Sequence, residues 1–365
     1  MPVKKTNGVS KGVIAKVGSV SVTDAINITG QRLWATRWIA GGSDDLYSTT
    51  DPDASADWGS LVALFNNGTT IKNISYGEDG VKGKLWVLGS NSTSHEIGYC
   101  PDDAVALARD FDDGSTPRWE DVTFTGNVQA ASGGPAVAWG NDAWVAGGHD
   151  HGSDPDVTSI KLSTNGGTTW SQITNAPQQV QATRCVCYKS GDVWFAINDS
   201  DIWKSTNNGT SWALVVEDPA SLTGVFNAMA YDPNDGVNGK WVVVGNAGVL
   251  AYSSDDWSSA TSVNPGFGSS KIWGVVYCTG IKKWVIVGQG GKIAHSSDAT
   301  SWTSATSGTT STLNGIATDG KTLVACADGG KVLISTNGTS WSTISSGLSG
   351  NLESIACDIV GEGMR

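Results

Sequence analysis

The sequence predicts an all-β protein: a seven-bladed β-propeller of four-stranded antiparallel blades, with a short N-terminal β arm. Three observations predict this fold. Short apolar runs and tight turns repeat along the chain, tryptophans recur at fixed places in the repeat, and the composition favours strands over helices. Of 365 residues, 47 are Gly and only 16% are charged, which suits many short strands joined by tight turns.

The clearest copy of the repeat is Gly315–Trp341, with the sequence GIATDGKTLVACADGGKVLISTNGTSW. Its apolar runs are separated by pairs such as Asp319-Gly320 and Asn337-Gly338, which predict hairpin turns because these residues tolerate positive φ. The unit is therefore a four-stranded meander. The copies end at Trp58, Trp119, Trp170, Trp212, Trp257, Trp302 and Trp341. Their later spacing of about 40–45 residues matches one propeller blade, so seven copies predict seven blades.

Tryptophan is unusually abundant, with 17 residues in the chain. Besides the closing position, most lie in the second strand of a repeat, and these are Trp38, Trp86, Trp144, Trp194, Trp241 and Trp284. Because Trp buries a large apolar surface, a periodic Trp is expected to form core between packed blades. Four tryptophans depart from the pattern and are the candidates for a carbohydrate-binding platform: Trp34, Trp139, Trp203 and Trp273.

The domain organisation follows from where the repeat begins and ends. Residues 1–30 contain short Val/Ile runs without Trp, and we expect either a docking arm or a flexible tail. Residues 31–365 are expected to form the propeller. Its first blade lacks a good opening strand, and Leu352–Asp358 resembles the opening strand of the other repeats. We therefore expect the C-terminal strand to pair into the first blade and close the ring, which removes free sheet edges.

The charge and the apolar pattern exclude several classes of protein. A net charge of −12 argues against nucleic-acid partners, whose binding depends on cations. Without an apolar run near 18 residues, no membrane insertion is expected. The N-terminus does not match a standard signal peptide, so synthesis in a host cytoplasm is expected. The cysteines contain no CxxC pair, and we expect free thiols.

One short loop has the residues of a metal site. The segment Gly147–Val157 contains a cluster of His and Asp residues, which are His149, Asp150, His151, Asp154 and Asp156. Imidazole and carboxylate groups at this spacing suit a divalent ion, although the same residues also suit a solvated polar loop. We regard the cluster as a binding candidate and expect neither a resident metal nor a cofactor.

The most specific motif is S-x-[DN]-x-G-x-x-W. Two copies are complete, with the defining residues Ser163, Asn165, Gly167 and Trp170 in one and Ser205, Asn207, Gly209 and Trp212 in the other. Two copies are one residue shorter and contain Asp298 with Trp302 and Asn337 with Trp341, and a further abbreviated copy contains Asp255 with Trp257. The short Asp or Asn side chain is expected to bond the amides of its own turn, while Gly takes the left-handed position and Trp anchors the hairpin.

This motif resembles the Asp-box, or BNR repeat, of sialidase-like β-propellers. In that family the box is a folding element at the blade periphery, so the resemblance implies a fold and no activity. Sialidases also require an arginine triad, a Tyr–Glu pair and an acid Asp. The arginines of this chain do not recur at matching blade positions. We therefore expect no catalytic residues and no enzyme.

Two further resemblances bear on function. The chain resembles photosystem II assembly propellers in fold, but lacks the Arg-rich patch of that family. Residues 1–30 contain segments such as Lys5–Val9 and Lys16–Val20, which resemble short repeats at the start of tailed-phage structural proteins. The latter resemblance implies a non-enzymatic virion protein, oligomeric in the particle, whose arm docks to other virion proteins and whose propeller faces a host-surface glycan or protein. The alternatives are a carbohydrate-active enzyme or lectin, and an assembly factor.

Overall fold

The computed structural model describes residues 38–42, 46–49, 59–60, 70–79, 83–90, 97–101, 120–122, 128–129, 136–150, 160–173, 176, 183–217, 224–344, 346–348 and 350–357. The chain divides into two units, Met1–Thr36 and Arg37–Arg365, and every described residue belongs to the second. The predicted arm and residues 31–37 lie outside this part. Within the described ranges, the structure has no helix long and apolar enough to span a bilayer.

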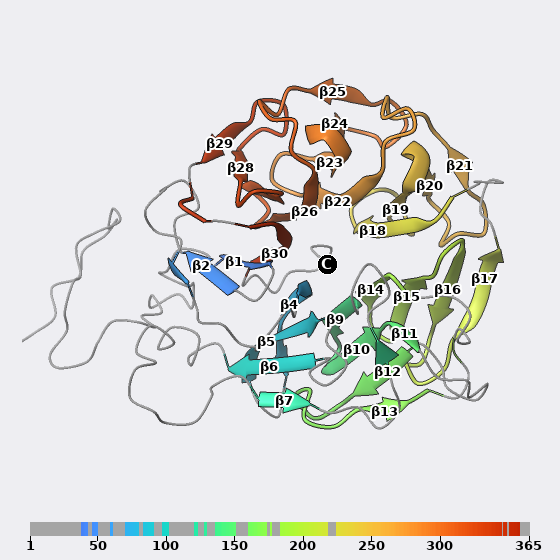
Figure 1. The fold of residues 1–365 in the computed structure, drawn as a ribbon. Coiled ribbons are helices and arrows are strands. Elements are labelled where there is room, and N and C mark those ends of the chain that lie inside the picture. Colours follow the sequence, from blue (N-terminus) through green and yellow to red (C-terminus); the bar gives the residue numbers. More distant parts are fainter. Residues whose placement is uncertain are drawn as a thin grey trace, which may run out of the picture. The chain divides into compact units, whose positions relative to one another are not determined.

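The second unit contains seven four-stranded antiparallel sheets (Figure 1), as the sequence predicts. We number these blades along the chain. From the innermost to the outermost strand, blade 1 consists of β30 (Leu352–Cys357), β1 (Trp38–Gly42), β2 (Leu46–Thr49) and β3 (Gly59–Ser60). Blade 2 consists of β4 (Ile71–Asp79), β5 (Gly83–Ser90), β6 (Ile97–Pro101) and β7 (Glu120–Val122). Blade 3 consists of β9 (Ala136–Gly140), β10 (Ala143–Gly147), β12 (Ile160–Ser163) and β13 (Ser171–Gln172).

Blades 4 to 7 are more regular. Their strands, in the same order, are β14 (Cys185–Ser190), β15 (Val193–Ile197), β16 (Asp201–Ser205) and β17 (Ala213–Glu217); β18 (Phe226–Asp232), β19 (Lys240–Gly245), β20 (Leu250–Ser253) and β21 (Thr261–Ser262); β22 (Ile272–Cys278), β23 (Lys283–Gly288), β24 (Ile293–Ser296) and β25 (Thr303–Ala305); and β26 (Leu313–Thr318), β27 (Leu323–Ala327), β28 (Val332–Ser335) and β29 (Ser342–Ile344). Two short 3₁₀ turns, η3 (Asn246–Gly248) and η4 (Gln289–Gly291), follow β19 and β23.

The ring closes through the C-terminal strand. β30 pairs antiparallel with β1, with Ile355 opposite Ala40, which is the pairing that the sequence predicts. The innermost strands contact one another in the order β30, β4, β9, β14, β18, β22 and β26, and β26 contacts β30 again. The innermost strands therefore contact one another around the whole ring, and their edges are short and protected.

The periodic tryptophans form the core between blades. The six second-strand residues are at most 1% exposed, and they are Trp38, Trp86, Trp144, Trp194, Trp241 and Trp284. Each lies opposite the same position of the innermost strand, and in four blades a tyrosine occupies that position with ring centroids 4.4–5.0 Å apart. In blade 7 the equivalent pair is Leu323 with Thr318. Tilted aromatic pairs of this kind add to the free energy of burial.

Small residues recur at one position of the innermost strands, and all seven line a central cavity. The position directly precedes the innermost-strand residue that lies opposite the second-strand tryptophan, or opposite Leu323 in blade 7. It is held by Ser75, Ala138, Cys187, Ala230, Val276, Ala317 and Ala356. Larger side chains would fill the space between the converging strands. This layer therefore explains why a central cavity remains open.

Candidate functional site

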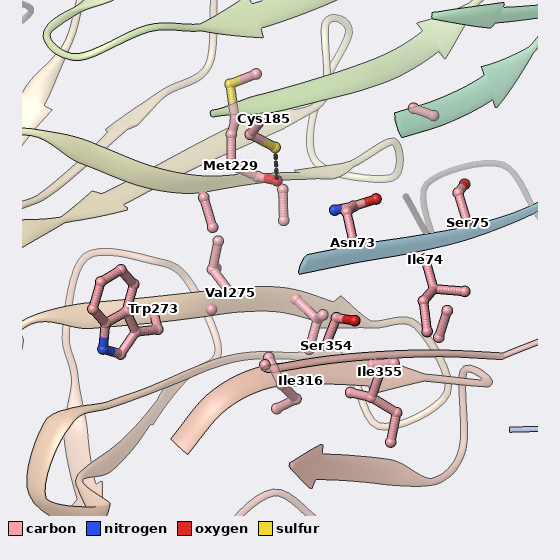
Figure 2. Close-up of a pocket in the computed structure, with 18 of the residues that line it drawn as sticks. Asn73, Ile74, Ser75, Cys185, Met229, Trp273, Val275, Ile316, Ser354 and Ile355 are labelled. Carbon is pink, nitrogen blue, oxygen red and sulfur yellow. Dashed lines mark hydrogen bonds between the residues drawn. The ribbon is translucent and has the colours of Figure 1, made fainter. Parts of the chain in front are cut away.

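A cavity of about 330 Å³ runs along the axis and is lined by the innermost strand of every blade. Figure 2 shows part of its wall, with Trp273, Ser354 and Cys185 on three different strands. Cavities lined by side chains from several rigid elements are the usual place for ligand binding. The features of its wall therefore decide what the protein can recognise.

One end of this cavity is marked by β-bulges. In blades 1, 2, 5, 6 and 7, the pairing between the innermost and second strands shifts register at the second residue of the innermost strand. The bulged residues are Glu353, Lys72, Asn227, Trp273 and Asn314, and all five line the cavity. A bulge leaves one residue unpaired and re-aims its side chain. The repeated bulge therefore presents a side chain to the cavity from each of these five blades.

In blade 4 the equivalent residue is Arg184, which directly precedes β14 and also lines the cavity. We call these six residues the mouth ring: Lys72, Arg184, Asn227, Trp273, Asn314 and Glu353. They start the innermost strands, so they occupy one end of the cavity. The equivalent residue of blade 3 lies outside the described residues.

Two members of the mouth ring join neighbouring blades. The side-chain amide of Asn227 donates to the backbone oxygen of Ile272 in blade 6 at 2.9 Å. Asn314 donates in the same way to the backbone oxygen of Leu352 in blade 1, also at 2.9 Å. These two amides therefore position the strands that carry Trp273 and Glu353, and their role is structural.

The charged members are partly satisfied within the protein. Lys72 pairs with Glu353 at 3.2 Å. The Nε atom of Arg184 donates to Asp199 at 2.8 Å, whereas its two terminal amino groups have no partner among the described residues. The side chain of Arg184 is only 16% exposed. A shielded guanidinium with free donors is suited to an anionic or polar ligand group.

Trp273 supplies the apolar surface of the ring. Its side chain is half-buried, and the ammonium group of Lys271 lies 5.2 Å from the centre of its indole. A half-buried aromatic ring offers a large rigid contact surface with a polar N–H at its edge. Deeper in the wall, the Ser354 hydroxyl is buried without a hydrogen-bond partner among the described residues. A buried hydroxyl of this kind is suited to a water or a ligand atom.

The four off-pattern tryptophans fall into different places. Trp273 lies in the mouth ring, and Trp34 lies outside the described residues. The interpretation of Trp139 as a binding platform is wrong: it pairs with Trp144 across blade 3 and is 9% exposed. Trp203 is partly buried against the core between blades 3 and 4, with its indole nitrogen covered, and its role as a platform stays a prediction.

The His/Asp cluster is only partly described. His149 and Asp150 form β11 (His149–Asp150), which pairs with β8 (Val128–Gln129). His151, Asp154 and Asp156 lie outside the described residues. The structure therefore leaves the role of this cluster as a binding site untested. Among the residues it describes, no group of three or more His, Cys, Asp or Glu side chains gathers.

The predicted box turns lie between the third and fourth strands of blades 3 to 7, and their hydrogen bonds follow one plan. In blade 4 the Ser205 hydroxyl accepts from the Gly209 amide at 3.0 Å, and the Asn207 side chain accepts from the Ser211 amide at 2.9 Å. The Trp212 indole donates to the Gly209 carbonyl at 3.0 Å. The boxes with Ser163 and Asn165, Asp298 with Trp302, and Asn337 make corresponding bonds. The turn chemistry predicted for these residues is confirmed.

One box residue has a different place from the one predicted. Trp257 is not the closing tryptophan of an abbreviated box. Its amide donates to the Ser253 hydroxyl at 2.9 Å, as Gly209 does in blade 4, and its φ is 70°. Trp257 thus fills the left-handed glycine position of a full-length box, and its side chain is buried between blades 4 and 5. The spacing of Ser, Asp and Trp in the sequence does not reveal that Trp257 replaces the glycine of the box.

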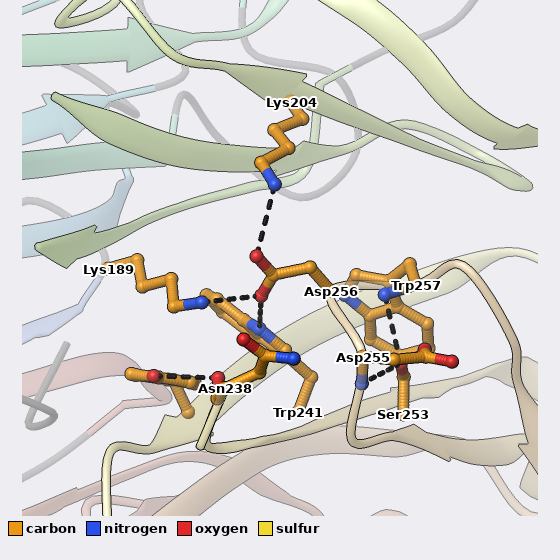
Figure 3. Close-up of polar contacts among 9 residues, drawn as sticks. Lys189, Lys204, Asn238, Trp241, Ser253, Asp255, Asp256 and Trp257 are labelled. Carbon is orange, nitrogen blue, oxygen red and sulfur yellow. Dashed lines mark hydrogen bonds and ion pairs between the residues drawn. The ribbon is translucent and has the colours of Figure 1, made fainter.

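The boxes of blades 4 to 7 also contact the preceding blade. In blade 5, Asp256 accepts hydrogen bonds from Lys189 at 2.7 Å and Lys204 at 3.0 Å, both in blade 4, and from Trp241 at 3.2 Å (Figure 3). Asn208 has the equivalent place in blade 4 and donates to the Asn141 carbonyl of blade 3. The shorter boxes lack this residue. There, lysines of the preceding blade donate to the carbonyls of Asp298 and Asn337.

Sequence reasoning missed most of the mouth ring, although a signal exists. In five blades the innermost strand begins with an apolar residue, a variable residue, a small residue or Asn, and another apolar residue, as in Ile272-Trp273-Gly274-Val275 and Leu313-Asn314-Gly315-Ile316. The variable position is the bulge. Comparing the repeats at that position would have selected Lys72, Asn227, Trp273, Asn314 and Glu353.

Comparison with known proteins supports the fold. No protein-family model matches the sequence, and no curated protein matches it. YCF48 from Cyanidioschyzon merolae matches with a TM-score of 0.54 and 16% identity, over 76% of this chain and 86% of that chain. A structure titled YCF48 bound to D1 peptide matches with a TM-score of 0.55 and 17% identity, over 78% and 84%.

A third similar structure is the WD40 β-propeller domain of Doa1, with a TM-score of 0.52 and 14% identity over 84% of this chain and 88% of that chain. Identities this low establish the β-propeller fold and nothing finer. This chain is therefore similar to YCF48 and WD40 propellers in architecture, and its function must be argued from its own residues.

Proposed function

We propose that the chain is a non-enzymatic recognition protein that binds its ligand at the mouth ring. The observation that carries the proposal is the recurrent bulge, because five blades depart from regular pairing at the same position and each presents a side chain there. Bulges at such positions re-aim side chains toward function. The charged and aromatic residues that result are groups that recognition uses, whereas the two amides hold neighbouring strands in place.

The pairing of the carboxylates argues for recognition rather than catalysis. Glu353 pairs with Lys72, and Asp199 pairs with Arg184. Asp328 accepts from the Asn314 side chain at 2.9 Å. General acid–base catalysis needs a carboxyl group that is free to exchange a proton with the substrate. The carboxylates around the mouth ring instead hold its cations and amides in place.

The proposed biological setting is a tailed-phage virion. This part of the proposal rests on the resemblance of residues 1–30 alone, with the arm docked to other virion proteins and the mouth ring directed at a host-surface glycan or protein. Mass spectrometry of purified particles tests it. Many copies of this chain per particle would support the setting, and its presence only in lysed cells would contradict it.

A second candidate is peptide binding in the assembly of a cellular complex. The similar structure titled YCF48 bound to D1 peptide favours it, as do the free terminal amino groups of Arg184. This candidate keeps the same mouth ring and changes only the ligand, from a surface glycan to a peptide segment. It predicts a stable peptide-bearing partner.

Both candidates are tested by probing the full-length chain against a glycan microarray and a peptide library. The proposal expects binding to one of them, abolished in Trp273→Ala and in Arg184→Gln. The matched control for the lost cation is Lys283→Gln, because Lys283 donates to the Asn337 carbonyl away from the cavity. Equal binding by the wild-type chain and both mouth-ring variants would contradict the proposed site.

A further inference from the structure

The wall of the central cavity contains a pair of thiols. Cys185 and Cys187 are two residues apart on β14, so their side chains share one face of the strand. Their sulfur atoms are 3.6 Å apart, and both residues line the cavity. Cys187 is fully buried and Cys185 half-buried, and both thiols are free.

The surroundings of the pair are also suited to a soft ligand. The Met229 carbonyl oxygen lies 3.2 Å from the Cys187 sulfur and 3.8 Å from the Cys185 sulfur, and Figure 2 shows the contact with Cys185. The Met229 side chain belongs to the same buried cluster as Cys187, and Cys185 packs against that cluster. Two thiols and the Met229 carbonyl thus meet at one point of the wall.

Packing alone explains a small residue at these positions but not two thiols. The positions equivalent to Cys185 and Cys187 are Ala136 and Ala138 in blade 3, and Ala228 and Ala230 in blade 5. Alanine therefore satisfies the geometry in both neighbouring blades. Among the described innermost strands, only β14 carries two cysteines.

We propose that Cys185 and Cys187 form a dithiolate site in the cavity wall that binds one soft monovalent metal ion, Cu(I). Thiolate ligands favour soft ions such as Cu(I). A structural zinc or iron–sulfur site needs four ligands, and the described residues bring no third His, Cys, Asp or Glu to this pair. An ion that accepts few ligands is therefore the best fit.

The geometry requires only a small adjustment. With metal–sulfur bonds of about 2.3 Å, two sulfurs on opposite sides of one ion are about 4.6 Å apart. The sulfurs therefore separate by about 1 Å through side-chain rotation toward the cavity. Binding releases one proton from each thiol and changes no oxidation state.

The test is an anaerobic titration of the reduced full-length chain with Cu(I) supplied as its bicinchoninate complex. We expect the wild-type chain to remove one equivalent of Cu(I) from the chelator. Cys185→Ala and Cys187→Ala should each lose this capacity, and their folding is safeguarded because neighbouring blades have Ala there. Cys187→Ser is a second variant, since Ser75 holds the equivalent position in blade 2.

The matched control is Cys326→Val, which removes a buried thiol outside the cavity wall. Val244 and Val287 hold the equivalent positions in blades 5 and 6, and this variant should retain one equivalent. X-ray absorption on the loaded chain should show at least two sulfur neighbours at the copper. The proposal is overturned if the wild-type chain retains no Cu(I), or if either alanine variant retains as much as the wild type. Neither result bears on the mouth ring.

Discussion

The periphery and the axis of this propeller differ in which part of the repeat stays constant from blade to blade. At the periphery, blades 3 to 7 place Ser and Asp or Asn in the same box turn with the same hydrogen bonds. At the axis, the same backbone bulge carries Lys, Asn, Trp, Asn or Glu, according to the blade. Constant side chains therefore mark the residues that build the ring, and we propose that the variable charged and aromatic side chains on a constant backbone recognise a ligand.

The largest expected effect on stability is that of Trp257→Ala at the interface of blades 4 and 5. The side chain is 1% exposed and packs with Phe195 and Trp241. Removing a buried Trp side chain should lower the free energy of unfolding by about 3–5 kcal/mol. Urea unfolding measures it. The half-buried Trp302, changed to Ala, is the comparison, and an equal or larger loss there would contradict the assignment of Trp257 to the glycine position.

The next effect is that of Asp256→Asn, which removes the charge between Lys189 and Lys204. The carboxylate is 18% exposed, so we expect a loss of about 2 kcal/mol at neutral pH, below the values for fully buried pairs. Asn is the matched choice because Asn208 holds the equivalent place in blade 4.

The ion pairs of Asp256 with Lys189 and Lys204 also predict that stability depends on pH. Burial raises the pKa of Asp256, but hydrogen bonds from Lys189, Lys204 and Trp241 outweigh it, so the pKa is lowered. A carboxyl group with a lowered folded pKa stabilises the protein fully above its unfolded pKa of about 3.9. The stability is then lost as the pH falls through the folded value. The free energies of unfolding of the wild type and Asp256→Asn should therefore converge in acid. A difference that stays constant with pH would contradict the stabilising role of the Asp256 ion pairs.

A smaller effect is expected within the box itself. Ser205→Ala leaves the amide of Gly209, which lies in a buried turn, without its acceptor. The cost of an unsatisfied buried donor is about 1–3 kcal/mol. Thr206→Ala is the control because Thr206 is exposed in the same turn, and it should change the stability by less than about 0.5 kcal/mol. Equal effects from the two variants would contradict the role of the serine as the centre of the turn.

The smallest effect on stability is expected at the mouth ring. Trp273→Ala removes a half-buried side chain at the cavity end, and should change the free energy of unfolding by less than about 1 kcal/mol. The thermal unfolding midpoint should accordingly remain close to that of the wild type. A loss as large as that of Trp257→Ala would show that Trp273 is a core residue and would remove it from the proposed site.

The sequence predicted the parts of the fold that depend on side-chain periodicity. Tryptophans at fixed intervals gave the seven blades and the core, and the likeness of Leu352–Asp358 to other opening strands gave the pairing of β30 with β1. Both follow from local patterns that repeat. The boundary between arm and propeller at residue 30 stays a prediction, because residues 1–37 lie outside the described part.

The site was harder to predict because it depends on backbone register. A bulge changes no residue type, so nothing in Phe226-Asn227-Ala228 alone shows that Asn227 is unpaired. The exchange of Trp257 for glycine was hidden for the same reason, since a bulky residue at positive φ opposes the usual preference. Trp139 was misassigned because departure from the repeat was equated with exposure.

The most direct test compares one variant from each region for binding. Wild type, Trp273→Ala and Ser205→Ala are applied to the same glycan microarray and peptide library at a temperature where all three are folded. The account predicts that Ser205→Ala keeps the wild-type binding pattern despite its lower stability, and that Trp273→Ala loses it at nearly unchanged stability. Binding retained by Trp273→Ala and lost by Ser205→Ala would contradict the division between a constant periphery and a recognising axis.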